Sequence, residues 1–498
     1  MSAAPPADAG RTPGRVHLAL PRGTPRPGPD RGLPGHPDGQ EVAVDTGDTA
    51  WVLVSAALVL FMTPGLALFY GGMVRAKSVL NMMMMSFGAL ALISVLWVLY
   101  GYSMAFGDDV GGGLLGNPFE FFGLSSLIGT AGLEGAFAPE NLVFTIPSLA
   151  FVAFQGVFAV LTVALISGAI ADRARFGPWM VFAGVWATLV YFPVAHWVFA
   201  FDGAESETGG WIANDLLAID FAGGTAVHIN AGAAGLALAL VLGKRRGFGR
   251  DPMRPHNLPL VMIGAGILWF GWIGFNSGSA LAANGQAAEV FVTTFAATGA
   301  ATLGWLLTEK LRDGHATSLG AASGVVAGLV AITPACSSVT PLGAIAVGLV
   351  AGVLCALAVG LKYRLGYDDS LDVVGVHLVG GLWGTLAVGL FASAATTAGV
   401  DGLFYGGGVD QLWRQALGGL AVLVYSFLLT LAIGFVIAKL MRFRITEEDE
   451  VAGIDGVVHA ETGYDLASLG SGGGSALAAP GQGRAEARGT HLTDRSRV

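Results

Sequence analysis

The sequence predicts an all-α integral membrane protein with eleven transmembrane helices. Of its 498 residues, 53% are hydrophobic and only 12% are charged, a balance more apolar than soluble domains with polar surfaces show. The apolar residues also gather in eleven runs, most of them near the roughly 20 residues that cross about 30 Å of hydrocarbon as a helix. We therefore expect lipid to surround most of the chain, and we expect no nucleic-acid partner.

Both ends of the chain are expected to be disordered. Residues 1–48 are rich in Pro, Gly, Arg and Asp and lack the apolar core of a signal peptide. Residues 468–498 consist largely of Gly, Ala, Ser and charged residues. Between these ends we expect a membrane domain at 49–443 and a cytoplasmic regulatory tail at 444–467.

The expected spans follow the apolar runs in chain order. They lie near residues 51–70, 80–106, 148–171, 178–201, 220–243, 258–275, 287–308, 319–333, 342–363, 372–391 and 415–441. Lys and Arg occupy every second connecting loop, as at Arg75 and Arg173, whereas the loops between are acidic, as at Asp108. Because cytoplasmic loops retain positive charge, we expect the N-terminus outside and the C-terminus inside. The arginines of residues 1–48 would then lie outside, which conflicts with this rule.

Two histidines lie deep within apolar runs. An ionisable residue at membrane depth costs about 2.5–3.5 kcal/mol on insertion scales and so points to a function. His228 follows Asp220 by eight residues, and His377 follows Asp372 by five. The two spans run in opposite directions in the predicted topology, as inverted-topology repeats do. We therefore predict an inverted five-helix repeat that brings both imidazoles to the middle of the membrane.

Each Asp is expected to cap its helix, because these separations do not place Asp and His on one helical face. For either histidine alone, the alternative is a packed polar side chain bonded to a neighbouring helix. The pairing favours a polar path, since neutral imidazoles both donate and accept hydrogen bonds. His196, which also lies in an apolar run, is expected near interfacial water at the outer end of its span.

The stretch GWIGFNSGS places Trp272, Phe275 and Ser279 at positions i, i+3 and i+7, on one face of a helix. They could contact one solute together, because an aromatic face returns about 2 kcal/mol to a cation that has shed water, and a hydroxyl supplies an acceptor. The alternative is an interfacial aromatic anchor with ordinary core packing. Gln155 and Phe158 in AFQGVFAV allow the same two interpretations.

Several blocks of sequence resemble the ammonium transporter (Amt/Mep/Rh) family. In chain order they are FMTPGLALFYGGMVRAKSVLNMMMMSF, VAFQGVFAVLTVALISGAIADRARF, DFAGGTAVHINAGAAGL, GWIGFNSGS, ITPACSSV and DVVGVHLVGG. The resemblance covers residues from about 51 to 465. It implies a homotrimer in the cell membrane, each eleven-helix subunit having its own pore, that transports ammonium or ammonia.

The resemblance also implies roles for particular residues. They are Ser279, Trp272, Phe199 and Asp220 at the ammonium site, Phe158 and Phe275 as a gate, and His228 and His377 as the pore pair. Phe199 is a departure, because the family usually has a Trp there and Phe offers a weaker π face. Trp272 and Ser279 favour the ammonium-transporter branch over the Rh branch.

The tail, with its Gly453-Ile454-Asp455 stretch, resembles a cytoplasmic region of that family. The resemblance associates it with docking of PII-type regulatory proteins and with coupling between subunits. The alternative is a solvated acidic tail.

We expect neither an enzyme nor a cofactor, because the sequence has no P-loop, Rossmann fingerprint, H-E-x-x-H or C-x-x-C motif. Two other functions stay open. One is an ammonium sensor that signals through its cytoplasmic tail. The other is a membrane enzyme with a metal held by His228, His377 and Asp, which is disfavoured because Asp220 and Asp372 are expected at opposite membrane ends.

Overall fold

The computed structural model describes residues 44–128, 142–204 and 206–464, and their regular structure is almost entirely helical. Within these residues, the strands are β1 (Leu142–Val143) and β2 (Ile146–Pro147), an antiparallel pair. The segments expected to be disordered lie largely outside the described residues. The first helix, however, begins at Thr46, so residues 46–48 belong to it rather than to the expected extension.

Ten helical segments of the described chain are long and apolar enough to cross a membrane. They are Thr46–Met73, Ala76–Phe106, Ser148–Ile170, Phe176–Phe199, Gly224–Leu242, Leu258–Gly278, Gly285–Asp313, Pro341–Leu365, Val374–Phe391 and Asp410–Met441. A further apolar helix, α11 (Ser318–Ile332), has only 15 residues. All eleven predicted runs thus coincide with helices, ten of which meet the length of a span.

Four of these ten segments are single helices: α1 (Thr46–Met73), α9 (Leu258–Gly278), α10 (Gly285–Asp313) and α15 (Asp410–Met441). Each of the other segments is compound and consists of two or more consecutive helices. The parts of the compound segments are η1 (Ala76–Ser78), α2 (Val79–Leu96), η2 (Trp97–Gly101) and α3 (Tyr102–Phe106); α5 (Ser148–Ile166) and η5 (Ser167–Ile170); α6 (Phe176–Trp186), η6 (Ala187–Tyr191) and α7 (Phe192–Phe199); η8 (Gly224–Ile229) and α8 (Asn230–Leu242); α12 (Pro341–Ala358) and α13 (Leu361–Leu365); η9 (Val374–Leu378) and α14 (Val379–Phe391). Short helices in the connections are η3 (Phe122–Leu127), η7 (Ile212–Leu216), η10 (Leu403–Tyr405), α16 (Glu447–Ala452) and η11 (Asp455–His459).

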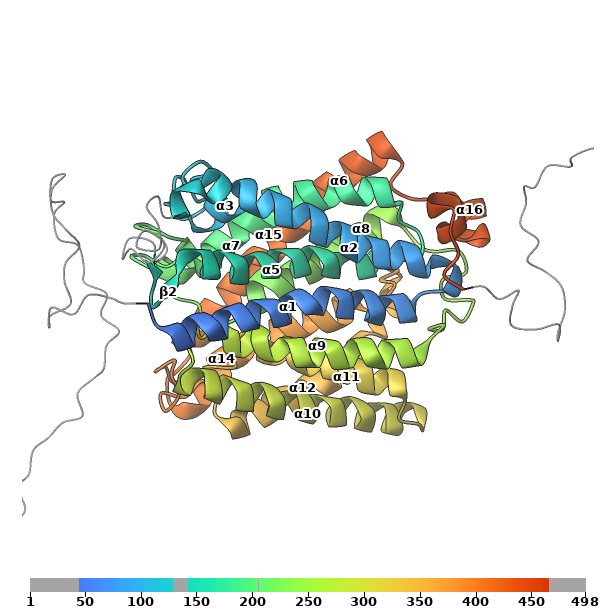
Figure 1. Cartoon of the computed structure of the whole chain (residues 1–498). Coiled ribbons are helices and arrows are strands. Elements are labelled where there is room, and N and C mark those ends of the chain that lie inside the picture. The colour runs from blue at the N-terminus through green and yellow to red at the C-terminus, as the bar shows by residue number, and fades with distance from the viewer. Residues whose placement is uncertain (1–43, 129–141, 205, 465–498) are drawn as a thin grey trace, which may run out of the picture. The chain divides into compact units, whose positions relative to one another are not determined.

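The long helices lie side by side, and α1 runs along α9 (Figure 1). Glycines let these two helices approach closely. A Cβ at Gly72 would lie 2.7 Å from the backbone oxygen of Asn257, and one at Gly274 would lie 2.8 Å from that of Ser55. Small residues at such contacts replace the hydrophobic driving force that lipid does not supply.

A network of buried ion pairs joins the basic loops at one end of the helices. The Arg245 guanidinium donates to both carboxylate oxygens of Asp368, at 2.9 and 2.8 Å, and also contacts Asp172 at 3.2 Å. Arg173 is fully buried beside Asp368. Burial lowers the pKa of Arg173 to about 10, although Asp368 opposes this shift. Burial alone would raise the pKa of Asp368, but Arg245 and Arg173 hold it below its ordinary value.

The tail packs against this same end, through α16 and η11 (Figure 1). The carboxylate of Glu450 is buried and accepts from the backbone N–H of Arg246 at 2.9 Å and from Arg444 at 3.2 Å. The carboxylate of Asp455 accepts from the backbone N–H groups of Leu80 and Asn81 at the start of α2, at 3.0 and 2.8 Å. These contacts contradict the alternative of a freely solvated acidic tail.

Candidate functional site

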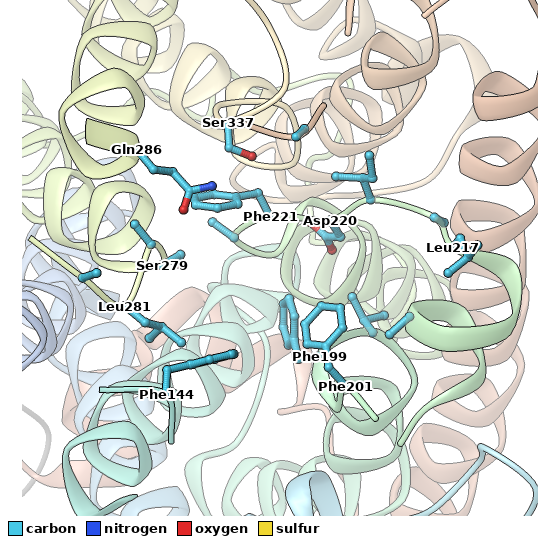
Figure 2. A pocket seen from close by; sticks show the side chains of 18 of the residues that line it. Phe144, Phe199, Phe201, Leu217, Asp220, Phe221, Ser279, Leu281, Gln286 and Ser337 are labelled. Atoms are coloured by element: carbon cyan, nitrogen blue, oxygen red, sulfur yellow. The ribbon is translucent and has the colours of Figure 1, made fainter. Parts of the chain in front are cut away.

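An open pocket of about 1010 Å³ lies at the end of the helices opposite the tail. Its wall combines aromatic rings with a few polar groups. Phe199, Asp220 and Ser279 line it (Figure 2), as do Gln155 and Phe158. The structure therefore brings together most of the residues that the sequence predicts at an outer site.

Ser279 is placed to accept a hydrogen bond from a solute in this pocket. Its hydroxyl donates to the backbone oxygen of Phe275 at 2.8 Å, which commits its one hydrogen. A hydroxyl oxygen has two lone pairs, so acceptor capacity remains on the pocket side. Phe199, whose side chain is nearly buried, adds an aromatic face to the same pocket (Figure 2).

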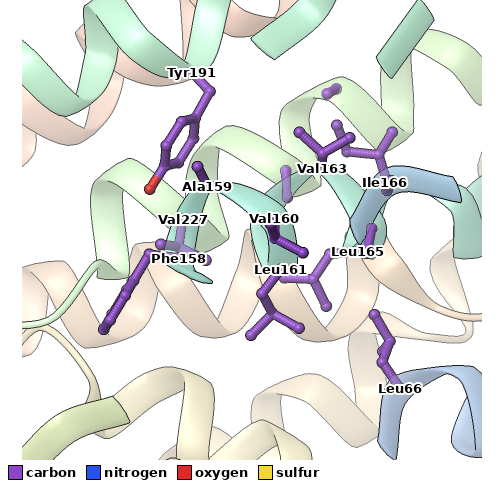
Figure 3. Close-up of a cluster of buried hydrophobic side chains, with 14 of the residues drawn as sticks. Leu66, Phe158, Ala159, Val160, Leu161, Val163, Leu165, Ile166, Tyr191 and Val227 are labelled. Atoms are coloured by element: carbon purple, nitrogen blue, oxygen red, sulfur yellow. The ribbon is translucent and has the colours of Figure 1, made fainter. Parts of the chain in front are cut away.

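Two phenyl rings pack against each other at the inner end of the pocket, and one of them, Phe158, lines it. The ring centroids of Phe158 and Phe275 lie 4.3 Å apart, with their planes tilted by 39°, and both side chains are almost fully buried. Phe158 lies among apolar residues of α5 with Val227 of η8 nearby (Figure 3). The two rings thus form an apolar barrier between the pocket and the residues behind them.

His228 and His377 meet directly behind this barrier. Their Nδ1 atoms lie 3.3 Å apart, and the two rings stack with centroids 5.3 Å apart. The His228 ring also lies 6.0 Å from the Phe275 ring. Both histidines are buried, and the Nε2 atom of His228 has no hydrogen-bond partner in the described residues. The predicted meeting of the two imidazoles is therefore present in the structure.

Trp272 does not line the outer pocket together with Ser279. Its indole is buried beneath Phe275 and stacks on the His228 ring, with centroids 5.3 Å apart and planes inclined by 22°. The helical spacing correctly places Trp272, Phe275 and Ser279 along one side of α9. The three residues are, however, spread along the length of α9 rather than gathered around one point.

Asp220 caps η8, as predicted. Its carboxylate oxygens accept from the backbone N–H groups of four residues, Gly223, Gly224, Thr225 and Ala226, at 2.6–3.1 Å. These donors are otherwise unpaired at a helix start, where a negative charge is also favourable. Asp220 therefore fixes the backbone of the segment that carries His228.

The cap predicted at Asp372 is wrong. Asp372 pairs instead with the Lys362 ammonium group at 2.7 Å. Asp369 is the residue that caps η9, accepting from the backbone N–H groups of Val373 and Val374 at 3.1 and 2.7 Å. Sequence reasoning missed Asp369, although a signal was present: Asp369 precedes His377 by eight residues, as Asp220 precedes His228.

The expectation of interfacial water at His196 is also wrong, because this side chain is fully buried. Its Nδ1 atom lies 3.1 Å from the backbone oxygen of Ala105, and its Nε2 atom lies 3.4 Å from the carboxylate of Asp109. The end of α3 and the loop that follows it therefore cover His196 of α7. His196 thus belongs to the scaffold above the pocket.

A second, very small space of about 10 Å³ lies on the tail side of His377 and is lined by Tyr70, Ser323 and Asp372 among others. The histidine pair therefore lies between the outer pocket and this inner space.

Across the described residues, no three His, Cys, Asp or Glu side chains are grouped as metal ligands would be. Residues of α15 near the pocket, Gln411 and Arg414, gave no sequence signal.

Comparison with known proteins supplies a family. The model of the family described as Ammonium Transporter Family matches residues 50–464. An ammonium transporter from Mycobacterium tuberculosis is 64% identical over 435 residues, which cover 85% of this chain and 91% of that protein. The crystal structure of Saccharomyces cerevisiae Mep2 has a TM-score of 0.73 at 34% identity and covers 82% of this chain and 89% of that one. A structure named Sensor Amt Protein has a TM-score of 0.74 at 29% identity, with 82% of this chain and 98% of that one covered.

Proposed function

The chain belongs to the ammonium transporter family and is a multi-pass protein of the plasma membrane, and we propose that it carries ammonium or ammonia through a pore in each subunit. The observation that carries this proposal is the 3.3 Å contact between His228 and His377. It lies between an outer pocket closed by two phenyl rings and a small inner space. An apolar barrier thus separates the polar groups of the outer pocket from the histidine pair, which disfavours passage of an ion that keeps its charge and hydration.

In the proposed mechanism, ammonium is received by the Ser279 oxygen and by aromatic faces that include Phe199. At or before the Phe158–Phe275 gate it gives its proton to solvent water in the open pocket, and the neutral ammonia passes along His228 and His377. Potassium has a similar size but has no N–H donors and cannot lose a proton, so the histidine pair discriminates where radius cannot. Asp220 supports the outer site by fixing the start of η8.

We also propose the finer architecture. The α11 helix completes eleven spans, and the two halves of five are related by inversion. Two observations support the repeat: the first helix of each half, α1 and α9, pack together, and each half carries a histidine eight residues after a capping Asp. The gathering of Arg75, Arg173, Arg245 and Arg444 at the tail end supports an inside C-terminus and an outside N-terminus.

Partners follow from the surfaces. Large apolar side chains such as Phe270, Phe295 and Phe435 are more than half exposed, which suits contact with lipid or with other subunits of a homotrimer. The docked tail offers a cytoplasmic surface for a PII-type regulatory protein. No cofactor enters the proposed mechanism, and the names of the relatives describe transport rather than catalysis.

The test is the current recorded from purified protein in supported liposomes during a pulse of ammonium, with a potassium pulse as control and a dye reporting internal pH. A current with ammonium alone indicates net charge movement, whereas internal alkalinisation without current indicates neutral ammonia. The alternative of an ammonium sensor predicts neither signal, together with ammonium-dependent protection of the tail from hydrogen exchange. A potassium current equal to the ammonium current would reject the proposed mechanism.

A further inference from the structure

We propose that Thr333 is a positioning residue of the path, one that holds the Trp272 indole against His228 and so fixes where that imidazole lies. The proposal rests on the transport function proposed above. Thr333 follows the last residue of α11 and lies outside the outer pocket. It acts on the solute only through Trp272.

The hydrogen bond that carries the proposal is buried. The indole N–H of Trp272 donates to the hydroxyl oxygen of Thr333 at 2.9 Å. Trp272 is 2% exposed and Thr333 is 0% exposed. An indole has one donor and no acceptor, so this contact is the one hydrogen bond that can hold the side-chain torsions of Trp272.

The Thr333 hydroxyl is itself held by neighbours. It has one hydrogen, which lies within reach of the backbone oxygen of Leu329 at 2.7 Å and of the Asn276 side-chain oxygen at 3.2 Å. The amide nitrogen of Asn276 in turn donates to the hydroxyl of Thr294 at 3.0 Å. A chain of buried polar side chains therefore ties α9, α10 and the end of α11 to the indole, and such networks specify one arrangement when every member is satisfied.

The indole matters because it supplies one of the three rings that stack around His228. Its ring contacts Trp272, Phe275 and His377, and its Nε2 atom has no partner in the described residues. Without the Thr333 oxygen, the Trp272 N–H would be left unpaired in a dry interior, which is costly. The indole would turn toward another acceptor, and the surface on which the His228 ring stacks would turn with it.

The chain offers a matched control for this bond. The indole N–H of Trp186 donates to the Thr430 hydroxyl at 2.8 Å, and both side chains are fully buried. This second pair joins α6 to α15, and neither residue lines the outer pocket or the inner space. Thr430→Val therefore removes the same kind of bond without touching the path.

The experiment compares Thr333→Val, Thr333→Ser and Thr430→Val in the full chain by ammonium-pulse transport and thermal unfolding. We expect both Val variants to lose similar thermal stability, but only Thr333→Val to lower transport per folded protein, by about tenfold, as the loss of one well-placed hydrogen bond allows. Thr333→Ser, which keeps the hydroxyl, should restore transport. Equal transport by the two Val variants would overturn the proposal. If Thr333→Val does not fold, Thr333→Cys, with its weak acceptor, replaces it.

A second measurement separates this proposal from the transport function. The ¹⁵N NMR signals of the His228 ring, assigned with His228→Gln, should move in Thr333→Val and stay in place in Thr430→Val. If the wild-type protein carries no ammonium, the proposed function fails, while these signals still decide whether Thr333 positions His228. Unchanged His228 signals in Thr333→Val would overturn the positioning role even in a protein that transports.

Discussion

The Nδ1 atoms of His228 and His377 lie 3.3 Å apart, so one hydrogen lies between them in a hydrogen bond. When both rings are neutral, one therefore carries its proton on Nδ1 and the other carries its proton on Nε2. The first ring then presents a bare Nε2 lone pair and the second presents an N–H. The pair thus offers one acceptor and one donor at the same time, which suits ammonia because it both accepts and donates.

Replacing both histidines by Ala should abolish ammonium transport or change its selectivity. Removing both imidazoles takes away the donor and the acceptor directly behind the phenyl rings, so we expect transport to fall by at least about tenfold. The measurement is the ammonium-pulse current with a potassium pulse beside it. His315→Ala, at an exposed position between α10 and α11, is the control and should leave transport unchanged. Wild-type rate and selectivity in the double variant would dispose of the role assigned to the pair.

Phe199→Trp should strengthen the outer site. Trp presents the best π face to a cation, worth on the order of 0.5–1 kcal/mol where water still has access. We expect the half-saturating ammonium concentration to fall about two- to fivefold, with little change in the maximal rate. Phe201, which lines the same pocket and is 44% exposed, provides the control Phe201→Trp. An equal gain from both substitutions would show that position 199 has no special part in binding.

Asp369 and Asp372 should respond differently to replacement by Asn. Asp369 is buried and uses both oxygens to cap η9, so Asp369→Asn should lower the free energy of unfolding by about 1–3 kcal/mol. The Asp372 side chain is 26% exposed and makes an ion pair, which solvent partly screens, so Asp372→Asn should cost less. Thermal unfolding in detergent measures both. A larger loss for Asp372→Asn would argue against the capping role of Asp369.

Glu450→Gln should loosen the tail. The buried carboxylate meets Arg75, Arg444 and the backbone N–H of Arg246, and removing its charge leaves these groups without a buried anion. We expect faster hydrogen exchange over residues 446–459, read by mass spectrometry. Glu448 lies in the same short helix but is exposed, so Glu448→Gln should leave exchange as it is. Equal protection in both variants would mean that other contacts hold the tail.

The helices were predictable because hydrocarbon thickness sets a length that can be counted along the chain. Every predicted run contains a helix. The count of full-length spans differs only at 319–333, where α11 has 15 residues. The histidine pair was also predictable, because two apolar runs each open with an Asp and carry a histidine a few residues further in.

The remaining site depended on contacts between distant segments. Asp372 opens the apolar run, which predicts it as the cap, but its backbone lies in a left-handed turn and its side chain pairs with Lys362, so the earlier Asp369 accepts from the first backbone N–H groups instead. Hydropathy predicts interfacial water at His196 because it does not show that Asp109 and the Ala105 carbonyl cover this side chain. The Trp272–Thr333 bond joins residues 61 positions apart, and no local pattern marks it.

His228 and His377 both lie in π-helical turns, His228 in η8 and His377 in η9. Such a turn contains one more residue than an α-helical turn, and it often marks a function. Removing a single codon from either turn would therefore restore ordinary winding and swing that imidazole by about 100° around the helix axis. The contact between the two imidazoles thus depends on the number of residues in each turn as well as on the histidines themselves. A one-residue deletion would break it although both histidines are still present.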